Sequence, residues 1–192
     1  MTEQLTKKWN ERYRAAKDEP TACYALREFT HLLPKTGDAL DLACGRGGNA
    51  LLLAKQGLQT QAWDLSSVAI EHLQTIADTE KLNIQASVHD VEKEPLQENS
   101  FDVIVVSYFL ERKLIPSLLK ALKPNGLLFY ETFIAEKTKG IGPSNPNFLL
   151  GENELLNLCS ELQILTYREE GMVGDMEKGQ RNVAMLVAQK RI

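Results

Sequence analysis

Apolar residues follow two alternating patterns along the chain, and together they predict an α/β order of elements. Short apolar runs typical of buried strands are separated by stretches in which apolar residues return every three or four positions, as on one face of a helix. The predicted strands cover residues 39–43, 59–64, 84–88, 101–106, 127–133, 163–169 and 182–189. The predicted helices cover residues 3–16, 22–33, 51–56, 66–81, 111–122 and 152–160. Strands that alternate with helices predict a mostly parallel sheet with helices on both faces.

Two regions depart from this regular order. The alternation of apolar residues over 182–189 favours an antiparallel pair at the end of the sheet. Residues 135–151 form a long polar segment rich in glycine and proline, and long loops inside compact domains are commonly functional. From the length we expect one domain, residues 1–192, in which a helical part, residues 1–34, precedes an α/β core, residues 35–192.

The most informative stretch combines an apolar strand, a glycine-rich turn and the start of a helix. Gly45 and Gly47 in the turn allow positive φ and let a ligand approach closely, because neither has a Cβ atom. The helix that follows begins with unpaired backbone N–H groups and the positive end of its dipole, which suits a negatively polarised group. The stretch therefore predicts a site for a nucleotide-like cofactor.

Two cofactor classes fit this turn. Gly45, Gly47 and Ala50 satisfy the dinucleotide pattern G-x-G-x-x-G/A, and Asp64 follows about 20 residues later, where an acid that binds ribose belongs. Asp41, however, lies inside the apolar strand, and its carboxylate would repel a pyrophosphate at the turn. A sulfonium cofactor with an amino-acid tail carries positive charges that this carboxylate would attract. Asp41 therefore favours a sulfonium cofactor over a nicotinamide dinucleotide.

Composition and charge narrow the function classes. The net charge of −4 gives no basic footprint, so no nucleic-acid partner is expected. No apolar run approaches the roughly 18 residues of a membrane span, and the N-terminus lacks the apolar core of a signal peptide, so no membrane association is expected. Cys23, Cys44 and Cys159 have no paired spacing, so we expect no disulfide framework, no metal site and a cytoplasmic location. The sequence indicates no particular oligomeric state.

Several motifs carry a resemblance to one family. The run D-x-A-C-G-x-G at residues 41–47 resembles the first motif of the class I S-adenosylmethionine-dependent methyltransferases, with Ala43 where many members have glycine. The run L-K-P-N-G-x-L at residues 122–128 is similar to the turn before the fifth strand in that family. The runs S-Y-F-L-E-R and N-P-x-F-L-L look most similar to small-molecule enzymes of the tellurite-resistance and thiopurine methyltransferase type. The resemblance covers roughly residues 36–190.

This resemblance implies a fold and an activity. The implied fold is α/β and doubly wound, a Rossmann-like sheet of seven mostly parallel strands with a C-terminal antiparallel strand. The implied activity is transfer of a methyl group from S-adenosyl-L-methionine to a small-molecule acceptor by in-line displacement. Two other classes stay open: an NAD(P)-dependent oxidoreductase, and a non-catalytic module that binds the cofactor and presents its surface to a protein partner.

Candidate cofactor residues lie at the turn and at the ends of strands. Asp64 ends the second predicted strand, where it could accept hydrogen bonds from both ribose hydroxyls or simply cap the next helix. In the resembling family, an acid at the position of Asp90 accepts from the adenine amine, and the backbone amide of the next residue serves the ring. The predicted cofactor-binding residues are Asp41, Ala43, Cys44, Gly45, Gly47, Asn49, Asp64, Leu65, Asp90, Val91, Ser107 and Tyr108.

Candidate catalytic and substrate residues lie near the same strand ends and in the N-terminal helix. A soft nucleophile such as a thiolate or a metalloid oxyanion needs no base, whereas a hydroxyl or ammonium acceptor needs one, and Glu111 and Glu131 are the catalytic candidates. Trp9 and Tyr13 share a helix face, either as core packing or as part of a lid over the cofactor. The predicted substrate-pocket residues are Trp9, Tyr13, Phe109, Arg112, Phe133, Phe148 and Arg181.

Overall fold

The structure is a computed structural model of the chain, and it describes residues 2–138 and 140–191. Met1, Lys139 and Ile192 lie outside the described residues, so both ends of the expected domain and one position of the expected 135–151 loop fall there. Among the residues that the structure describes, no helix is both long and apolar enough to cross a membrane.

Seven strands form one sheet in the order β3-β2-β1-β4-β5-β7-β6. The first five strands run parallel to one another, and β7 pairs antiparallel with both β5 and β6. The strands are β1 (Asp38–Leu42), β2 (Gln59–Asp64), β3 (Ile84–Val88), β4 (Phe101–Ser107), β5 (Leu122–Phe133), β6 (Gln163–Glu169) and β7 (Val183–Gln189). The predicted fold, a mostly parallel sheet with one antiparallel strand near its C-terminal end, is confirmed.

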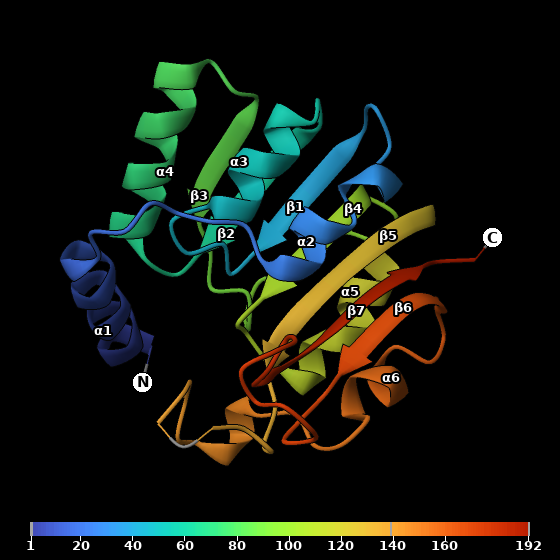
Figure 1. Cartoon of the computed structure of the whole chain (residues 1–192). Coiled ribbons are helices and arrows are strands. Elements are labelled where there is room, and N and C mark those ends of the chain that lie inside the picture. The colour runs from blue at the N-terminus through green and yellow to red at the C-terminus, as the bar shows by residue number, and fades with distance from the viewer. Residues whose placement is uncertain (1, 139, 192) are drawn as a thin grey trace.

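Helices cover both faces of this sheet (Figure 1). The helices are α1 (Thr2–Ala15), α2 (Tyr24–Glu28), α3 (Gly48–Lys55), α4 (Ser67–Glu80), α5 (Ile115–Ala121) and α6 (Glu154–Leu158), with short 3₁₀ turns η1 (Thr30–Leu32), η2 (Arg112–Leu114) and η3 (Pro146–Phe148). Alternate residues of the central strands serve the two faces: Val103 and Val105 pack with α2 and α3, whereas Ile104 and Val106 pack with α5 and α6. Burial on both faces explains the continuous apolar run of β4.

Three elements depart most from the predictions, while α3 begins three residues earlier than expected and α6 is two residues shorter at each end. The helix expected over 22–33 is divided at Phe29, whose backbone (φ −112°, ψ 27°) leaves the helical region, so α2 and η1 replace it. The helix expected over 111–122 begins as η2 and ends one residue early, because Leu122 already pairs with Phe101 in the sheet. The strand expected over 127–133 therefore starts at Leu122 and takes in the K-P-N-G turn, with an irregular register next to Phe101.

The carboxyl ends of the parallel strands meet at one edge of the sheet. Figure 1 shows α1 and the 135–151 segment lying beyond this edge, on the side to which the arrowheads of β1 and β5 point. In open parallel sheets, ligands bind outside the carboxyl ends of the strands. The N-terminal helix and the long loop therefore lie where such a ligand would be.

Candidate active site

The turn between β1 and α3 has three residues with positive φ, which are Ala43 (55°), Gly45 (53°) and Gly47 (82°). Its two glycines are each next to a different side chain. A Cβ atom on Gly45 would lie 2.9 Å from the Tyr13 hydroxyl oxygen, whereas one on Gly47 would lie 2.4 Å from a methyl carbon of Leu73. Gly47 therefore makes room for the core side of α4, and Gly45 makes room at the side where α1 crosses the turn.

Cys44 is buried in this turn. Its thiol donates to the Gly45 carbonyl oxygen at 3.4 Å. Burial raises the pKa of the Cys44 thiol well above its usual value, and the negative charges of Asp41 and Asp64 raise it further. The thiol therefore stays protonated at neutral pH, which suits a small residue that lines the turn and does not suit a nucleophile.

Asp41 is fully buried at the end of β1. One carboxylate oxygen accepts from the Asn49 side-chain amide at 3.1 Å, and the other accepts from the Ala50 backbone amide at 3.0 Å. Burial raises the pKa of the Asp41 carboxyl to about 7, although both hydrogen bonds act to lower it. Asp41 thus ties the strand to the first turn of α3, and its own contacts in the structure are internal.

Asn49 connects this carboxylate to two other elements. Its amide nitrogen also donates to the Ser107 hydroxyl at the end of β4, at 2.9 Å. Its amide oxygen accepts from the Cys23 backbone amide, just before α2, at 2.8 Å. The side chain is almost fully buried, and each of its polar atoms is used. The predicted site residues Asp41, Asn49 and Ser107 are therefore brought together in one network.

Asp64 at the end of β2 links the glycine turn to the start of α4. One carboxylate oxygen accepts from the Gly45 backbone amide and the other from the Ser66 backbone amide, each at 2.8 Å. Burial raises the pKa of Asp64, and the hydrogen bonds oppose that shift. A carboxylate has about four lone-pair positions, so acceptor capacity remains on both oxygens. Leu65 follows, partly buried, between Asp64 and the Ser66 cap of α4.

The predicted adenine-side residues lie just after β3. The Asp90 carboxylate accepts from the Lys93 ammonium group at 2.6 Å, and Val91 is buried in the core. His89, for which no role was predicted, stacks on Trp63 with ring centroids 4.3 Å apart. This stacked pair is a site feature that the sequence pattern did not indicate, because Trp63 lies on a different strand.

Glu131, a candidate base, is fully buried on β5. One carboxylate oxygen accepts from the Tyr108 hydroxyl at 2.9 Å, and the other accepts from the Ala25 backbone amide at 2.8 Å. Burial of the hydroxyl and then the charge of Glu131 raise the pKa of Tyr108, which therefore remains a donor. Glu111, the other candidate, caps η2 by accepting from the Lys113 amide at 3.0 Å. In this structure both carboxylates hold protein groups.

Arg112, predicted in the substrate pocket, anchors the long loop. Its guanidinium group forms two parallel hydrogen bonds with Glu154, at 2.6 and 2.9 Å. It also donates to the carbonyl oxygens of Asn147 and Leu149, at 2.8 and 2.9 Å. The hydrogen bonds from Arg112 lower the pKa of Glu154. Arg112 therefore joins η2 to α6 and to the long loop.

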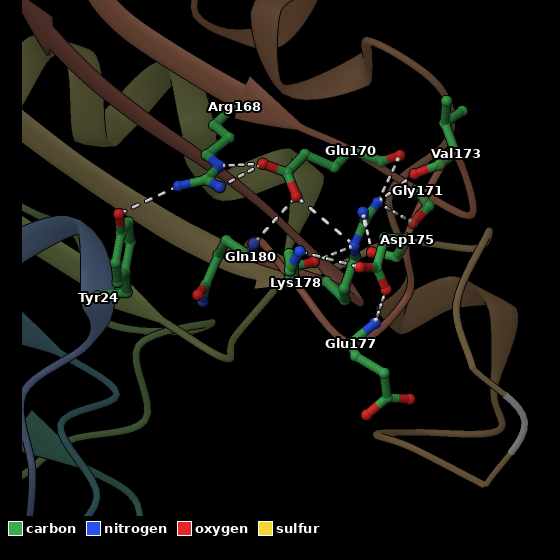
Figure 2. A network of polar contacts seen from close by, with 10 residues as sticks. Tyr24, Arg168, Glu170, Gly171, Val173, Asp175, Glu177, Lys178 and Gln180 are labelled. Atoms are coloured by element: carbon green, nitrogen blue, oxygen red, sulfur yellow. Dashed lines mark hydrogen bonds and ion pairs between the residues drawn. The ribbon is translucent and has the colours of Figure 1, made fainter.

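Arg181, also predicted in the pocket, is enclosed by the loop that joins β6 to β7. Its guanidinium group donates to the carbonyl oxygens of residues in that loop, namely Gly171, Val173, Asp175 and Lys178. Figure 2 shows the adjoining part of this network, in which Arg168 joins Glu170 to the Tyr24 hydroxyl of α2. Both predicted pocket arginines are therefore engaged by the protein.

The predicted aromatic pocket residues do not form one cluster. Phe133 lies beside Tyr108, with ring centroids 5.2 Å apart. Phe109 packs against the core, and Phe148 is exposed in η3. Trp9 and Tyr13 stack on each other on α1 at 5.6 Å. The structure thus pairs Phe133 with the network around Glu131 and places Tyr13 next to the glycine turn.

Two contacts that hold the N-terminal segment were not predicted. The Ser66 hydroxyl donates to the Asn10 side-chain oxygen at 2.6 Å, which fixes α1 to the start of α4. Arg46, inside the glycine turn, forms an ion pair with Asp18 at 3.0 Å and also donates to its carbonyl oxygen. A basic residue between two turn glycines was the only sequence signal for the second contact. Burial raises the pKa of Tyr13, and the charge of nearby Asp64 adds to the shift.

Comparison with known proteins decides the family. Residues 9–187 match the family described as "Tellurite resistance protein TehB". The chain belongs to the TehB family. The predicted recognition as a class I S-adenosylmethionine-dependent methyltransferase of this type, and the predicted cofactor, are confirmed with it. This assignment decides against the nicotinamide alternative.

Individual relatives are more distant. Hemagglutinin 1 of Eikenella corrodens is 29% identical over 139 residues, covering 68% of this chain and 45% of the relative. The ubiquinone biosynthesis O-methyltransferase of Rickettsia akari is 26% identical over 166 residues, covering 74% of this chain and 64% of the relative. The chain thus spans less than two thirds of either relative. The crystal structure of TehB from Haemophilus influenzae aligns with a TM-score of 0.71 at 23% identity, over 97% of this chain and 67% of that one, which shows the shared fold.

Proposed function

We propose that this TehB-family methyltransferase acts on a small-molecule acceptor at the carboxyl edge of the sheet. The observation that carries the proposal is the link from the buried carboxylate of Asp64 to the amide of Gly45, at 2.8 Å, which joins the end of β2 to the turn. The residues present fit S-adenosylmethionine. Two buried carboxylates, Asp41 and Asp64, flank the turn, which suits hydroxyl and ammonium groups and disfavours a pyrophosphate.

In this proposal, Asp64 holds the ribose hydroxyls with the acceptor capacity that Gly45 and Ser66 leave free. The predicted role of Asp90 and Val91 on the adenine side stays a proposal, as does that of Leu65. Bound S-adenosylmethionine supplies an electrophilic methyl group, which the acceptor takes by in-line displacement. The buried network of Asp41 and Asn49 keeps the turn in one arrangement, and such positioning can be worth about 7–11 kcal/mol of the barrier.

The acceptor supplies its own lone pair in this proposal. Glu131 is fully buried and already accepts from Tyr108 and Ala25, and Glu111 caps η2, so both candidate bases are engaged by protein donors in the described structure. An acceptor atom that is already nucleophilic near neutral pH needs no such base. This favours a soft nucleophile over an alcohol.

Of the expected N-terminal lid, residues 1–34, we further infer that α1 closes over the core, residues 35–192, whereas α2 belongs to the core itself, with Ala25 and Leu26 fully buried. Helix α1 rests on the start of α4 through Asn10 and places the Tyr13 hydroxyl against Gly45. Such a lid excludes water and completes a site when the ligand is bound. In the described contacts, the Asn10 side chain joins α1 to the start of α4, at an exposed side of the molecule where local opening is easiest.

Calorimetry with S-adenosylhomocysteine tests the proposal. Losing charge-assisted hydrogen bonds to two hydroxyls in Asp64→Ala should weaken binding by about 1.5–3 kcal/mol, or roughly 10- to 150-fold. Glu71→Ala, an exposed carboxylate on the neighbouring α4, is the matched control and should bind like the wild type. Wild-type affinity in Asp64→Ala would remove Asp64 from the site. Cofactor binding without product over a broad acceptor panel would instead support a non-catalytic module.

A further inference from the structure

Tyr108 has a backbone conformation that bulky residues rarely adopt. Its φ is 55°, in the left-handed region, at the carboxyl end of β4. Such strain costs free energy and persists where the surroundings impose it, most often at functional sites. Here one residue, Glu131, imposes it twice. The Tyr108 amide donates to the Glu131 carbonyl oxygen at 2.8 Å, and the Tyr108 hydroxyl donates to the Glu131 carboxylate at 2.9 Å.

The ring of Tyr108 is fixed but not covered. The residue is 52% exposed, although its hydroxyl is bonded to a fully buried carboxylate. Phe133, on the adjacent β5, lies 5.2 Å away with the ring planes at 41°. The long loop backs Phe133, because a Cβ atom on Gly142 would lie 2.6 Å from its ring. The rings of Tyr108 and Phe133 therefore form an aromatic wall, fixed in place by their contacts, at the ends of β4 and β5.

This aromatic wall, Tyr108 and Phe133, adjoins the cofactor turn. Ser107, the residue before Tyr108, accepts from Asn49, which follows the turn and is bonded to Asp41. An acceptor bound against the wall would therefore be close to the cofactor position proposed above.

Apolar groups also mark the loops on the same side. Ile141 precedes Gly142 and is exposed, as are Met172 and Val173 in the loop between β6 and β7. That loop meets the long loop, because a Cβ atom on Gly171 would lie 2.4 Å from the carboxylate of Glu136. The two predicted pocket arginines, Arg112 in η2 and Arg181 in the β6–β7 loop, are bonded to protein carboxylate and carbonyl groups. The surroundings thus offer ring faces and apolar side chains.

Resting on the proposed methyltransferase function, we propose that Tyr108 and Phe133 bind the flat, uncharged ring of an aromatic acceptor. Aromatic rings gain specific offset or edge contacts with one another, beyond their burial. Glu131 is then a positioning residue, which holds the Tyr108 ring in its strained orientation and acts on the acceptor only through it.

The name of the family mentions tellurite, which is an oxyanion. An oxyanion acceptor would need a cationic group in the pocket instead of an uncharged ring. The guanidinium group suited to it is that of Arg27 on α2. Arg27 is exposed and shows no hydrogen bond or ion pair from its side chain among the described contacts. The two acceptor classes therefore depend on different residues, Tyr108 and Phe133 for a ring and Arg27 for an oxyanion.

The test uses two thiol probes of similar size, benzyl mercaptan and cyclohexylmethanethiol, with sodium selenite as the oxyanion probe. Methylation of each is followed as S-adenosylhomocysteine formed, and KM and kcat are determined separately. The wild type should show a lower KM for the flat ring. Tyr108→Leu and Phe133→Leu should each raise that KM by about 2- to 12-fold and leave the KM of the cyclohexyl probe unchanged. Tyr108→Phe keeps the ring but loses the hydrogen bond to Glu131 that holds it, so it should reduce the preference for the flat ring without abolishing it.

Two controls keep the outcomes distinct. Phe29→Leu removes a ring that contacts His31 and should change neither KM. Saturation-transfer NMR of benzyl alcohol and cyclohexylmethanol, with S-adenosylhomocysteine present, reports the same preference without turnover. Equal KM values and equal saturation for the two rings would overturn the inference, as would a preference for selenite that is lost in Arg27→Ala. Failure of the wild type to bind S-adenosylhomocysteine would instead refute the proposed function itself.

Discussion

Asp41 should make the stability of the fold depend on pH. On folding, its pKa rises from 3.8 to about 7, because burial disfavours the charged form more than the hydrogen bonds from Asn49 and Ala50 favour it. Between these values the folded state holds a proton that the unfolded state has released. The free energy of unfolding therefore falls as the pH rises from about 4 to about 7. At about 1.4 kcal/mol per pKa unit, the loss is about 4 kcal/mol.

Urea denaturation of the wild type and of Asp41→Asn between pH 4 and pH 8 isolates this contribution. The Asn amide keeps an acceptor for Asn49 but turns an N–H group toward the Ala50 amide, which costs about 1–3 kcal/mol at every pH. Because the variant has no titrating group there, the difference between the two unfolding free energies should move by about 4 kcal/mol in favour of the variant. Asp64, whose pKa is also raised by burial, is present in both proteins, so the difference between them reports the loss of the Asp41 carboxyl together with its interaction with Asp64.

Parallel pH profiles for the two proteins would refute this reasoning, because they would show that Asp41 titrates alike in the folded and unfolded states. Asp78→Asn is the matched control. That carboxylate is exposed on α4, where it accepts from Gln74, so the profile of this variant should follow the wild type.

Two further predictions concern the segments beyond the sheet edge. Arg112→Lys cannot reproduce the two parallel hydrogen bonds to Glu154 or reach both loop carbonyls, so it should destabilise the fold by about 1–2 kcal/mol and speed proteolysis within 135–151, as read by mass spectrometry. If α1 and the long loop form a lid, amide hydrogen exchange in both segments should slow together when S-adenosylhomocysteine is added. Asn10→Ala should weaken that response, because it removes the contact between α1 and α4. If exchange does not change with the ligand, Trp9 and Tyr13 are ordinary packing residues.

The strands and the glycine turn were predictable because local patterns determine them. Apolar runs of strand length and glycines at fixed spacing leave few alternatives, so β1, β2, β3 and β6 lie where expected, within one residue. Element ends were less predictable where tertiary contacts override local preference. Leu122 is helical by pattern, but its pairing with Phe101 draws it into β5. Boundaries of this kind depend on partners that are distant in the sequence.

The predicted site residues show the same division. Asp41, Asn49, Asp64 and Ser107 were placed by motif and by strand ends, and the structure brings them into one region. For charged residues outside the glycine turn and the strand ends that flank it, the sequence pattern predicted the position but not the partner. From the sequence, Arg112 could equally have contacted a ligand. The structure shows that its guanidinium group donates to Glu154 and to two carbonyl groups.

Hydrogen bonds to two side chains of the site attach the N-terminal segment to it. Asn49 and Glu131 hold the turn and Tyr108, and the same two side chains receive the amides of Cys23 and Ala25. The segment before α2 is therefore fixed by the groups that shape the cofactor edge. Arg46 adds an attachment at Asp18 from within the turn itself. Under the proposal that α1 closes as a lid, its motion would pivot between its last residue, Ala15, and Asp18, and a ligand that shifts the turn at Gly45 would act on α1 at both this pivot and its Tyr13 contact.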